Sequence, residues 1–478
     1  MPIEYLGLSS INGPLIVLEG VQDAFYDEIV EFIVGGKEKR IGRIIELYED
    51  KAVIQVFEGS EGMSLVNTHT RLTGHPMEIG LSKEMLGRTF NGIGQPIDDL
   101  GPIAARVRRD VNGLPLNPVK REYPRNYIRT GISAIDGLTT LIRGQKLPIF
   151  SGNGLPHDQL AAQIVKQASL GEDSDEEFAI VFAAMGVKHD VADFFRRTFE
   201  ESGVADHVAM FLNLANDPVV ERLITPKVAL TVAEYLAFEQ NMHILVILTD
   251  MTSFAEAMRE VSSSKGEIPS RKGFPGYLYS ELAAIYERAG IVEGVNGSVT
   301  QIPILTMPND DITHPIPDLT GYITEGQIVL DRNLNGQSIY PPISVLPSLS
   351  RLMKDGIGEG YTREDHQDLA NQLFSAYAKV GDARNLASVI GEDELSPIDK
   401  EYLAFGKEFE EKYIGQGPEE NRTIEETLDL GWELLGRLPR EELDRVDTKI
   451  LDKYYHPTKR DDGVTTSASP GSVANKEM

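Results

Sequence analysis

Short stretches of alternating apolar and polar residues open the chain and predict β-strands. One stretch covers residues 29–33, a second covers 41–45, and a third covers 51–57. A pair of glycines separates the first two, and Glu49–Asp50 separates the last two, as expected of turns. Strands this short and this close together favour a small β-barrel, which we place at residues 1–75. We expect this barrel to serve solubility or assembly.

The pattern changes after the barrel, and predicted strands alternate with predicted helices from residue 76 to 353. The stretches 147–150, 178–184 and 244–248 are continuously apolar. Strands of a parallel sheet have this composition because helices cover both faces. The segment is therefore predicted to be an α/β domain with a parallel sheet.

A helical pattern follows, and we assign residues 354–460 to an α-helical domain. Thr362-x-x-Asp365 and Thr423-x-x-Glu426 both have the form of a capping box, each before an apolar-periodic stretch. Ser396 followed by Pro397 has the form of an N-cap with proline at the first helical position.

Apolar spacing also predicts the core of the helical domain. Four residues share one predicted helix face, namely Leu369, Leu373, Tyr377 and Val380. Trp432 and Tyr454–Tyr455 are expected in the same core. The last segment, 461–478, is rich in small and polar residues and is predicted to be disordered.

Composition narrows the classes of function. The chain has 74 acidic and 46 basic residues, a formal net charge of −28, which opposes binding to nucleic acid or to anionic lipid. It contains no cysteine, so disulfides and thiolate chemistry are excluded. No apolar run reaches the roughly 18–20 residues of a membrane span, and the first residues do not have the pattern of a signal peptide.

One segment has the context of a phosphate-binding P-loop, which needs a strand, a glycine-rich turn and a helix that opens with lysine and Ser/Thr. The loop comprises Ser151, Gly152, Asn153, Gly154, Leu155, Pro156, His157 and Asp158. Its chemistry is altered, because Pro156 replaces a glycine and removes an N–H donor. His157 occupies the lysine position, and Asp158 replaces the magnesium-binding hydroxyl. We expect Asp158 to repel phosphate and to cap the helix itself.

Such a turn after a strand is common, so the loop alone does not indicate a degraded phosphate site. Asp250 follows the apolar stretch 244–248 and stands where a Walker-B aspartate would help to hold magnesium. An aspartate at this place is also the usual cap of a helix. His157, His189 and His314 lack metal-ligand spacing and are expected to be structural.

Longer motifs make the chain resemble the B subunit of V/A-type rotary ATPases, the non-catalytic partner of the A subunit. The matching segments are MLGRTFNG at 85–92, QPID at 95–98, TGISAIDG at 130–137, PIFS at 148–151, GLPH at 154–157, KGFPGYLY at 272–279, IYERAG at 285–290 and PPISVLPSLSR at 341–351. The resemblance implies a P-loop-type (RecA-like) central domain between the barrel and the helices. The short segment before the barrel is expected of the prokaryotic type.

The resemblance also assigns roles to single residues. Catalytic rotary subunits have a glutamate that orients the attacking water, and Val187 stands in its place. A valine cannot polarise water. Arg351 ends the last motif and is implied to be an arginine finger that acts in trans on the nucleotide of a neighbouring A subunit. A carboxylate cluster, comprising Glu392, Asp393, Glu394, Leu395 and Ser396, resembles the loop that contacts the rotor shaft, although charge runs are usually solvated loops.

The implied partners are catalytic A subunits in an alternating hexamer, the rotor shaft and the peripheral stalk. ATP or ADP with magnesium is expected at the interface, held mainly by the A subunit and not tightly by this chain. The complex would lie on the cytoplasmic face of the plasma membrane, pump protons or sodium, and make or hydrolyse ATP. Two alternatives stay open, namely an independent ATPase with an unorthodox P-loop and a hexameric nucleic-acid motor, which the acidic charge opposes.

Overall fold

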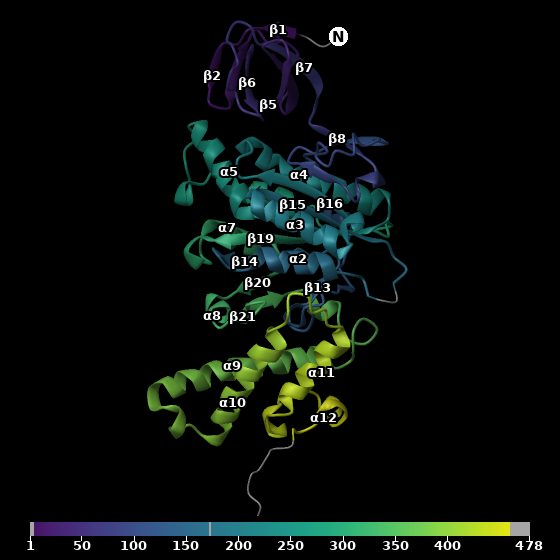
Figure 1. Cartoon of the computed structure of the whole chain (residues 1–478), viewed down its shortest axis with the longest axis vertical. Helices are drawn as coiled ribbons and strands as arrows, with labels where there is room; N and C mark the ends of the chain where they lie inside the picture. Colours follow the sequence, from purple (N-terminus) through teal and green to yellow (C-terminus); the bar gives the residue numbers. More distant parts are fainter. Residues whose placement is uncertain (1–3, 172–173, 459–478) are drawn as a thin grey trace, which may run out of the picture.

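The structure is a computed structural model that describes residues 4–171 and 174–458, and it stacks three domains along one long axis (Figure 1). The β-barrel lies at one end, the α/β domain in the middle, and the helical domain at the other end. The predicted three-part fold is therefore confirmed. The segment 461–478, predicted to be disordered, lies outside the described residues, and the predicted domain limits stay predictions.

The N-terminal domain is an antiparallel sheet in the order β1-β7-β4-β5-β6-β3-β2. Its strands are β1 (Glu4–Leu6), β2 (Ser10–Asn12), β3 (Leu15–Glu19), β4 (Glu28–Val34), β5 (Glu38–Tyr48), β6 (Lys51–Val56) and β7 (His69–Pro76). The three strands predicted from the alternating pattern are β4, β5 and β6. The sheet curves around an apolar core that includes Ile16, Phe32 and Ile54.

The central domain is built on one sheet, in the order β21-β20-β14-β19-β17-β15-β16-β9. Its strands are β9 (Thr89–Asn91), β14 (Ile149–Gly152), β15 (Phe178–Val187), β16 (Val208–Leu214), β17 (His243–Thr249), β19 (Ser298–Met307), β20 (Gly326–Leu330) and β21 (Ile343–Ser350). The strands from β9 to β20 pair in parallel, and β21 pairs antiparallel with β20. The predicted parallel sheet is therefore confirmed, with antiparallel additions: β21 at one edge, and the short strands 290–292 and 121–122 off the main path.

Helices cover both faces of this sheet, which explains the continuous apolar strands. The helices are α2 (His157–Gln167), α3 (His189–Ser202), α4 (Val219–Glu234), α5 (Met251–Ser264), α6 (Leu278–Tyr286) and α7 (Pro315–Ile323), and a π-helical turn, η4 (Tyr235–Glu239), extends α4. Alternate residues of β15 face opposite cores: Val181 packs with α4 and α5, whereas Phe182 packs with α2 and α3.

Short elements complete the central domain. The strands are β8 (Glu78–Leu81), β10 (Val107–Asp110), β11 (Arg121–Glu122), β12 (Tyr127–Ile128), β13 (Leu141–Ile142) and β18 (Gly290–Val292), and the helices are α1 (Ser133–Asp136) and α8 (Arg332–Gly336). The 3-10 turns are η1 (Lys83–Met85), η2 (Pro118–Lys120), η3 (Ala205–His207), η5 (Arg271–Gly273), η6 (Pro308–Asp310) and η7 (Met353–Asp355).

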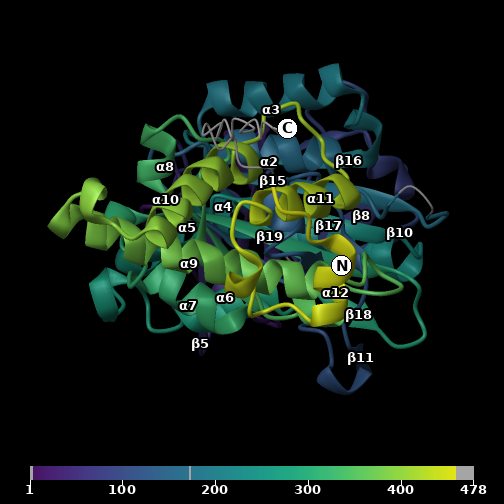
Figure 2. The same cartoon turned by 90° about the horizontal axis from the view of Figure 1, so that it is seen from below.

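The C-terminal domain is helical and lies below the sheet in Figure 1, so it is in front of the sheet in Figure 2, which is seen from below. It comprises α9 (His366–Ile390), η8 (Glu392–Glu394), α10 (Pro397–Glu408), the π-helical turn η9 (Phe409–Ile414), α11 (Ile424–Leu435), η10 (Arg440–Glu442) and α12 (Thr448–Tyr454). The capping box Thr423–Glu426 and the Ser396–Pro397 helix start are confirmed. The predicted core is confirmed as well, since Leu369, Trp432 and their neighbours form one apolar cluster.

The capping box predicted at Thr362 is wrong. Helix α9 begins at His366, and its N-cap residue Asp365 makes no side-chain capping bond. The Asp365 carboxylate instead accepts from Trp432 Nε1 at 2.6 Å and from the Arg363 guanidinium. Thr362 Oγ1 accepts from the Gly358 backbone N–H at 2.8 Å. The two side chains therefore bind these partners and do not form the reciprocal bonds of a capping box.

A buried carboxyl lies near the junction of the barrel and the central domain. Burial, together with the nearby carboxylates of Asp217 and Glu58, raises the pKa of Glu221, on α4, to about 7. A carboxyl whose pKa is higher in the folded than in the unfolded state stabilises the fold at low pH. This stability is lost as pH rises from about 4.5 through about 7.

We therefore expect Glu221→Gln to stabilise the chain at pH 8 and to change little at pH 5. The gain should be about 1–2 kcal/mol after an allowance for partial solvent access. Thermal unfolding at the two pH values measures it. Glu201→Gln, at an exposed position of α3, is the matched control and should show no pH-dependent difference. Equal midpoints for Glu221→Gln and the natural chain at pH 8 would contradict the expectation.

Candidate functional site

The altered phosphate loop has the predicted strand–turn–helix geometry. Strand β14 ends at Gly152, and α2 begins at His157. Gly154 has a φ of +80°, a left-handed conformation that favours glycine. The sequence therefore predicted the backbone context of a P-loop correctly.

An ion pair from two other segments lies directly against this loop. The Arg332 guanidinium, at the start of α8, binds the Asp310 carboxylate at 2.7 Å and 2.9 Å. Arg332 Nη2 also donates to the carbonyl oxygen of Asn153 at 2.9 Å. A Cβ atom placed on Gly152 would lie 2.2 Å from Asp310 Oδ1, so this carboxylate fills the space beside the glycine. A phosphate bound here would meet a carboxylate.

His157 turns back onto its own loop. Its Nδ1 lies 3.1 Å from the carbonyl oxygen of Leu155 and 3.0 Å from Ser151 Oγ. A carbonyl oxygen only accepts, so the contact to Leu155 requires a protonated Nδ1. A P-loop lysine extends toward phosphate, whereas this imidazole is used for contacts within the loop.

Asp158 adds negative charge at the same helix end, but the predicted cap is wrong. The N-cap residue of α2 is Pro156, and the helix start has no side-chain capping bond. Asp158 lies in the first turn, with one carboxylate oxygen 3.6 Å from His157 Nε2. Burial raises its pKa, His157 lowers it, and the Asp250 carboxylate raises it. Proline at the N-cap takes the place that a capping carboxylate would need.

The Walker-B-like Asp250 is engaged as a structural cap. It precedes α5 and accepts from the Thr252 backbone N–H at 2.8 Å. It also accepts from Thr306 Oγ1 at 2.7 Å and from the Thr306 backbone N–H at 3.2 Å. These three donors tie the end of β17 to the end of β19. The usual role of an aspartate after a strand, to cap the next helix, is therefore present.

Val187 ends β15 near this edge of the sheet and packs against the apolar core on the α3 side. Its carbonyl oxygen accepts from the Ala215 backbone N–H at 2.7 Å. A valine side chain offers no proton acceptor to a water molecule. This residue therefore holds strand and loop together and supplies no general base.

Arg351 follows the last residue of β21 and is exposed. Its backbone N–H donates to the carbonyl oxygen of Glu325 at 2.9 Å, and its Nη1 donates to the carbonyl oxygen of Thr324 at 3.3 Å. Within the described part of the chain, no carboxylate lies within ion-pair distance of the guanidinium. The positive charge of this side chain is therefore available to a partner.

Arg351 and the altered loop lie at opposite ends of the strands of the central sheet. The loop follows the carboxyl end of β14, which is parallel to β20. Strand β21 runs antiparallel and ends where β20 begins, with Ser350 opposite Gly326. Arg351 is level with residue 325 of the β20 side, whereas residue 152 of β14 is level with residue 331, six positions further along. The separation along the strands is therefore about 20 Å. Arg351 therefore cannot serve the phosphate loop of its own chain.

The acidic cluster forms the turn between α9 and α10. Glu392, Asp393 and Glu394 are exposed in η8, at the tip of a hairpin that projects beyond the rest of the helical domain (Figures 1 and 2). Leu395 is buried, and Ser396 caps α10 by accepting from the Asp399 N–H at 3.3 Å. The carboxylates are thus available to a partner, whereas the last two residues of the cluster hold the turn.

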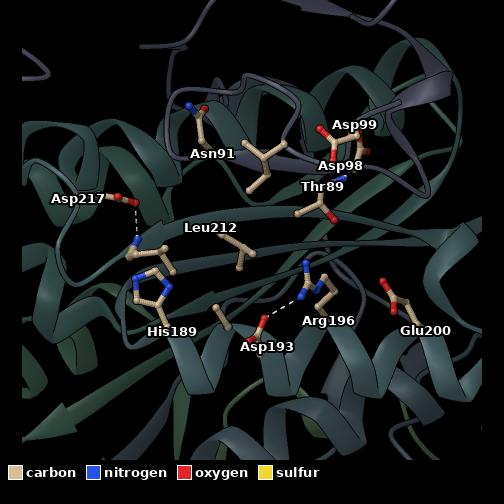
Figure 3. Close-up of a pocket in the computed structure, with 13 residues that line it drawn as sticks. Thr89, Asn91, Asp98, Asp99, His189, Asp193, Arg196, Glu200, Leu212 and Asp217 are labelled. Atoms are coloured by element: carbon tan, nitrogen blue, oxygen red, sulfur yellow. Dashed lines mark hydrogen bonds and ion pairs between the residues drawn. The ribbon is translucent and has the colours of Figure 1, made fainter. Parts of the chain in front are cut away.

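A separate cavity of about 490 Å³ lies between β9, β16 and α3 (Figure 3). Carboxylates dominate its lining, from Asp98, Asp99, Asp193, Glu200 and Asp217. Its Arg196 is paired with Asp193 at 2.8 Å. No residue of the loop 151–158 lines the cavity, and its charge opposes a phosphate-bearing ligand.

The histidines have structural roles or lack metal partners. The described residues contain no group of three or more His, Cys, Asp or Glu side chains placed to hold a metal ion. His314 caps α7 and packs edge-on against Phe274.

Among the described residues, no helix has the length and apolar composition to cross a membrane.

Comparison with known proteins assigns all three domains. Residues 131–350 match the nucleotide-binding domain of the ATP synthase alpha/beta family, residues 8–74 match the β-barrel domain of that family, and residues 355–455 match the C-terminal domain of V and A type ATP synthase. The chain is 64% identical over 457 residues to the V-type ATP synthase beta chain 2 of Clostridium tetani, covering 95% of this chain and 99% of that one.

The same relationship extends to archaea. The B subunit of the A-type ATP synthase from Aeropyrum pernix is 58% identical over 458 residues, covering 96% of this chain and 98% of that one. The chain belongs to the B subunits of V/A-type ATP synthases. Among solved structures, the ATP synthase subunit NeqB from Nanoarchaeum equitans superposes with a TM-score of 0.71 at 40% identity, covering 89% of this chain and all of that one.

The B subunit is the non-catalytic subunit of the complex, and this agrees with the altered loop. The chain contains a nucleotide-binding domain by family. Sequence reasoning found the altered loop but missed the Asp310–Arg332 pair that lies against it. These two residues are far from the loop in sequence, and neither belongs to a quoted motif, so no local signal marks them.

Proposed function

We propose that this B subunit alternates with catalytic A subunits in a hexameric ring and supplies Arg351 in trans to the nucleotide of the neighbouring A subunit. The observation that supports this most directly is the placement of Arg351. The side chain is exposed, has no carboxylate partner among the described residues, and lies at the opposite sheet edge from its own loop. A guanidinium in this position is free to stabilise the charge that develops on a γ-phosphate in a neighbouring subunit.

The strand that leads to Arg351 supports a subunit interface at the same place. Strand β21 is the edge strand of the sheet, and Leu346 and Leu349 are 42% and 39% exposed. Exposed apolar residues on an edge strand favour aggregation unless a partner covers them. An A subunit seated on β21 would cover these leucines and bring its nucleotide toward Arg351.

ATP or ADP with magnesium is proposed to be held mainly by the A subunit. The loop of this chain has Asp310 beside Gly152 and Asp158 in the first turn of α2. Asp310, paired with Arg332, fills the space beside the loop, and the Asp158 carboxylate repels phosphate. Neither lysine nor a hydroxyl takes the motif positions. Tight nucleotide binding by this chain is therefore not expected.

The acidic tip of the α9–α10 hairpin is proposed to contact the rotor shaft. Its three exposed carboxylates, on Glu392, Asp393 and Glu394, favour a basic surface on that partner. The peripheral stalk is a further proposed partner. The complex would contact the membrane only through other subunits, on the cytoplasmic face of the plasma membrane, and would couple ATP to proton or sodium movement.

The assembly and the assignment of catalysis can be tested together. The purified chain alone should hydrolyse no ATP in the presence of magnesium. Mixed with the catalytic A subunit of the same source, it should form an alternating hexamer by native mass spectrometry, and the mixture should hydrolyse ATP. Magnesium-dependent turnover by the isolated chain would instead support the alternative of an independent ATPase. A mixture that stays unassembled would contradict the proposed ring.

A further inference from the structure

An acidic residue stands directly across from the proposed arginine finger. The ladder between β21 and β20 ends with Ser350 opposite Gly326, so Arg351 and Glu325 are the first residues beyond it on the two segments. The backbone N–H of Arg351 donates to the carbonyl oxygen of Glu325 at 2.9 Å. Side chains that are directly opposite in an antiparallel pair lie on the same face, with Cβ atoms roughly 4.5–5.5 Å apart. Glu325 is therefore a natural ion-pair partner for Arg351.

The structure shows a different partner for this carboxylate. Lys146 Nζ lies 2.9 Å from Glu325 Oε1, and the Lys146 backbone N–H donates to Glu325 Oε2 at 2.9 Å. The Glu325 backbone N–H donates in turn to the Lys146 carbonyl oxygen at 3.2 Å. Both carboxylate oxygens are thus held by one residue, whose side chain is 3% exposed. Among the described residues, no ion pair joins the Glu325 carboxylate to the Arg351 guanidinium.

Lys146 is itself held in place. Its Nζ also lies 2.9 Å from Glu287 Oε1, and Glu287 Oε2 accepts from Arg121 Nη2 at 2.8 Å. These four charged side chains form an alternating row at the amino edge of the sheet. A buried lysine with two carboxylates is well compensated, so its position is fixed.

The adjacent residue fixes the main chain beside Arg351. Gln145 is fully buried, and its Nε2 donates to Ser350 Oγ at 2.9 Å and to the Glu325 carbonyl oxygen at 3.2 Å. The side-chain amide of Gln145 therefore binds both Ser350, which precedes Arg351, and Glu325, whose carbonyl oxygen accepts from the Arg351 backbone. Gly326 allows the close approach of the two strands, since a Cβ there would lie 2.2 Å from the Leu349 carbonyl oxygen.

We infer that Lys146 is a positioning residue for Arg351, which keeps the finger unpaired by binding the Glu325 carboxylate. This inference rests on the proposed role of Arg351. Without Lys146, the Glu325 carboxylate would pair with the nearby guanidinium of Arg351, because hydrogen bonds between charged groups are stronger than those between neutral ones. The pair would turn the guanidinium away from the neighbouring nucleotide and offset its charge.

The test uses the complex assembled with catalytic A subunits and measures steady-state ATP hydrolysis. Lys146→Met should lower kcat by about 10–100-fold, the loss expected when a catalytic group is displaced by roughly 1 Å. KM for ATP should stay unchanged, because the A subunit holds the ground-state nucleotide. Lys146→Met combined with Glu325→Gln should restore most of kcat, since the competing charge is gone, and Glu325→Gln alone should be near the natural value.

Thr300→Val is the matched control. Thr300 Oγ1 accepts from the Gly144 N–H at 2.8 Å, so the change removes a fully buried hydrogen bond two residues from Lys146 without contact to Glu325. Its kcat should stay within about twofold of the natural complex. If Lys146→Met does not assemble, Lys146→Gln takes its place, with the same requirement of rescue by Glu325→Gln.

The outcomes separate this inference from the role of Arg351 itself. An unchanged kcat in the Lys146 variants, or a fall in kcat that Glu325→Gln does not reverse, would overturn the inference and leave the proposed role of Arg351 unaffected. A fall in kcat that Glu325→Gln reverses would support the inference. If Arg351→Ala itself retains turnover, the proposed function fails first, and the inference fails with it.

Discussion

Replacing Arg351 with alanine is expected to reduce ATP turnover by the assembled complex by about 10³–10⁵-fold, the range seen for arginine fingers in other systems. Phosphoryl transfer spreads negative charge over the γ-phosphate oxygens, and a guanidinium from the opposite side stabilises that charge. Assembly should be unaffected, because the side chain is exposed and its single side-chain hydrogen bond within the described residues is the 3.3 Å contact to Thr324.

Single-turnover hydrolysis and native mass spectrometry on the same preparation measure the two effects separately. Arg351→Lys keeps the charge but loses the planar fork, so it should recover only part of the rate. Arg196→Ala is the control, since this arginine on α3 is half exposed and paired within its own helix. If the Arg351→Ala complex turns over ATP within a few-fold of the rate of the natural complex, Arg351 is not an arginine finger.

The second large effect is on folding. Arg288→Met should lower the free energy of unfolding by about 3–5 kcal/mol, as expected when one partner of a buried ion pair is removed. The Arg288 side chain is 1% exposed and binds both carboxylate oxygens of Glu234, at 2.6 Å and 2.7 Å. It also donates to the Val111 carbonyl oxygen at 3.0 Å and to Thr231 Oγ1 at 2.9 Å. All these acceptors would lose their donor.

Chemical unfolding of the isolated chain measures this loss. Arg109→Met provides a matched comparison, because Arg109 pairs with Glu239 at 3.1 Å and both side chains are well exposed. An exposed pair contributes at most about 1 kcal/mol, so this variant should be nearly natural. Equal stability of the two variants would show that the bonds of Arg288 to α4 and to Val111 do not stabilise the fold.

The three-part fold could be predicted from sequence because each part has its own pattern of apolar and polar residues. Alternation of apolar and polar residues marked β4 to β6, and continuous apolar runs marked β15 and β17. The pattern could not show that β21 turns antiparallel at the sheet edge. That strand mixes buried and exposed residues, and its direction depends on its pairing with β20.

The candidate site was predictable where its chemistry is local. Pro156, His157 and Asp158 follow one another, so the altered loop could be inferred from their types alone. Contacts from distant segments could not. Asp365 binds Trp432, 67 positions away, in place of the predicted capping bond, and Asp310 reaches the loop from a segment more than 150 positions away. Such contacts depend on which side chains lie close together in the folded chain, and the spacing of residues along the sequence does not show this.

The opposite placement of the altered loop and Arg351 gives the subunit two unlike sides. In a closed ring of alternating subunits, contacts are head-to-tail, so successive boundaries differ in composition. At one boundary the B subunit would face an A subunit with Arg351. At the next it would face one with the altered loop, which carries Asp158 and has Asp310 packed against it. Half of the boundaries would then perform chemistry while the other half transmit movement. The ring would advance in thirds of a revolution rather than in sixths.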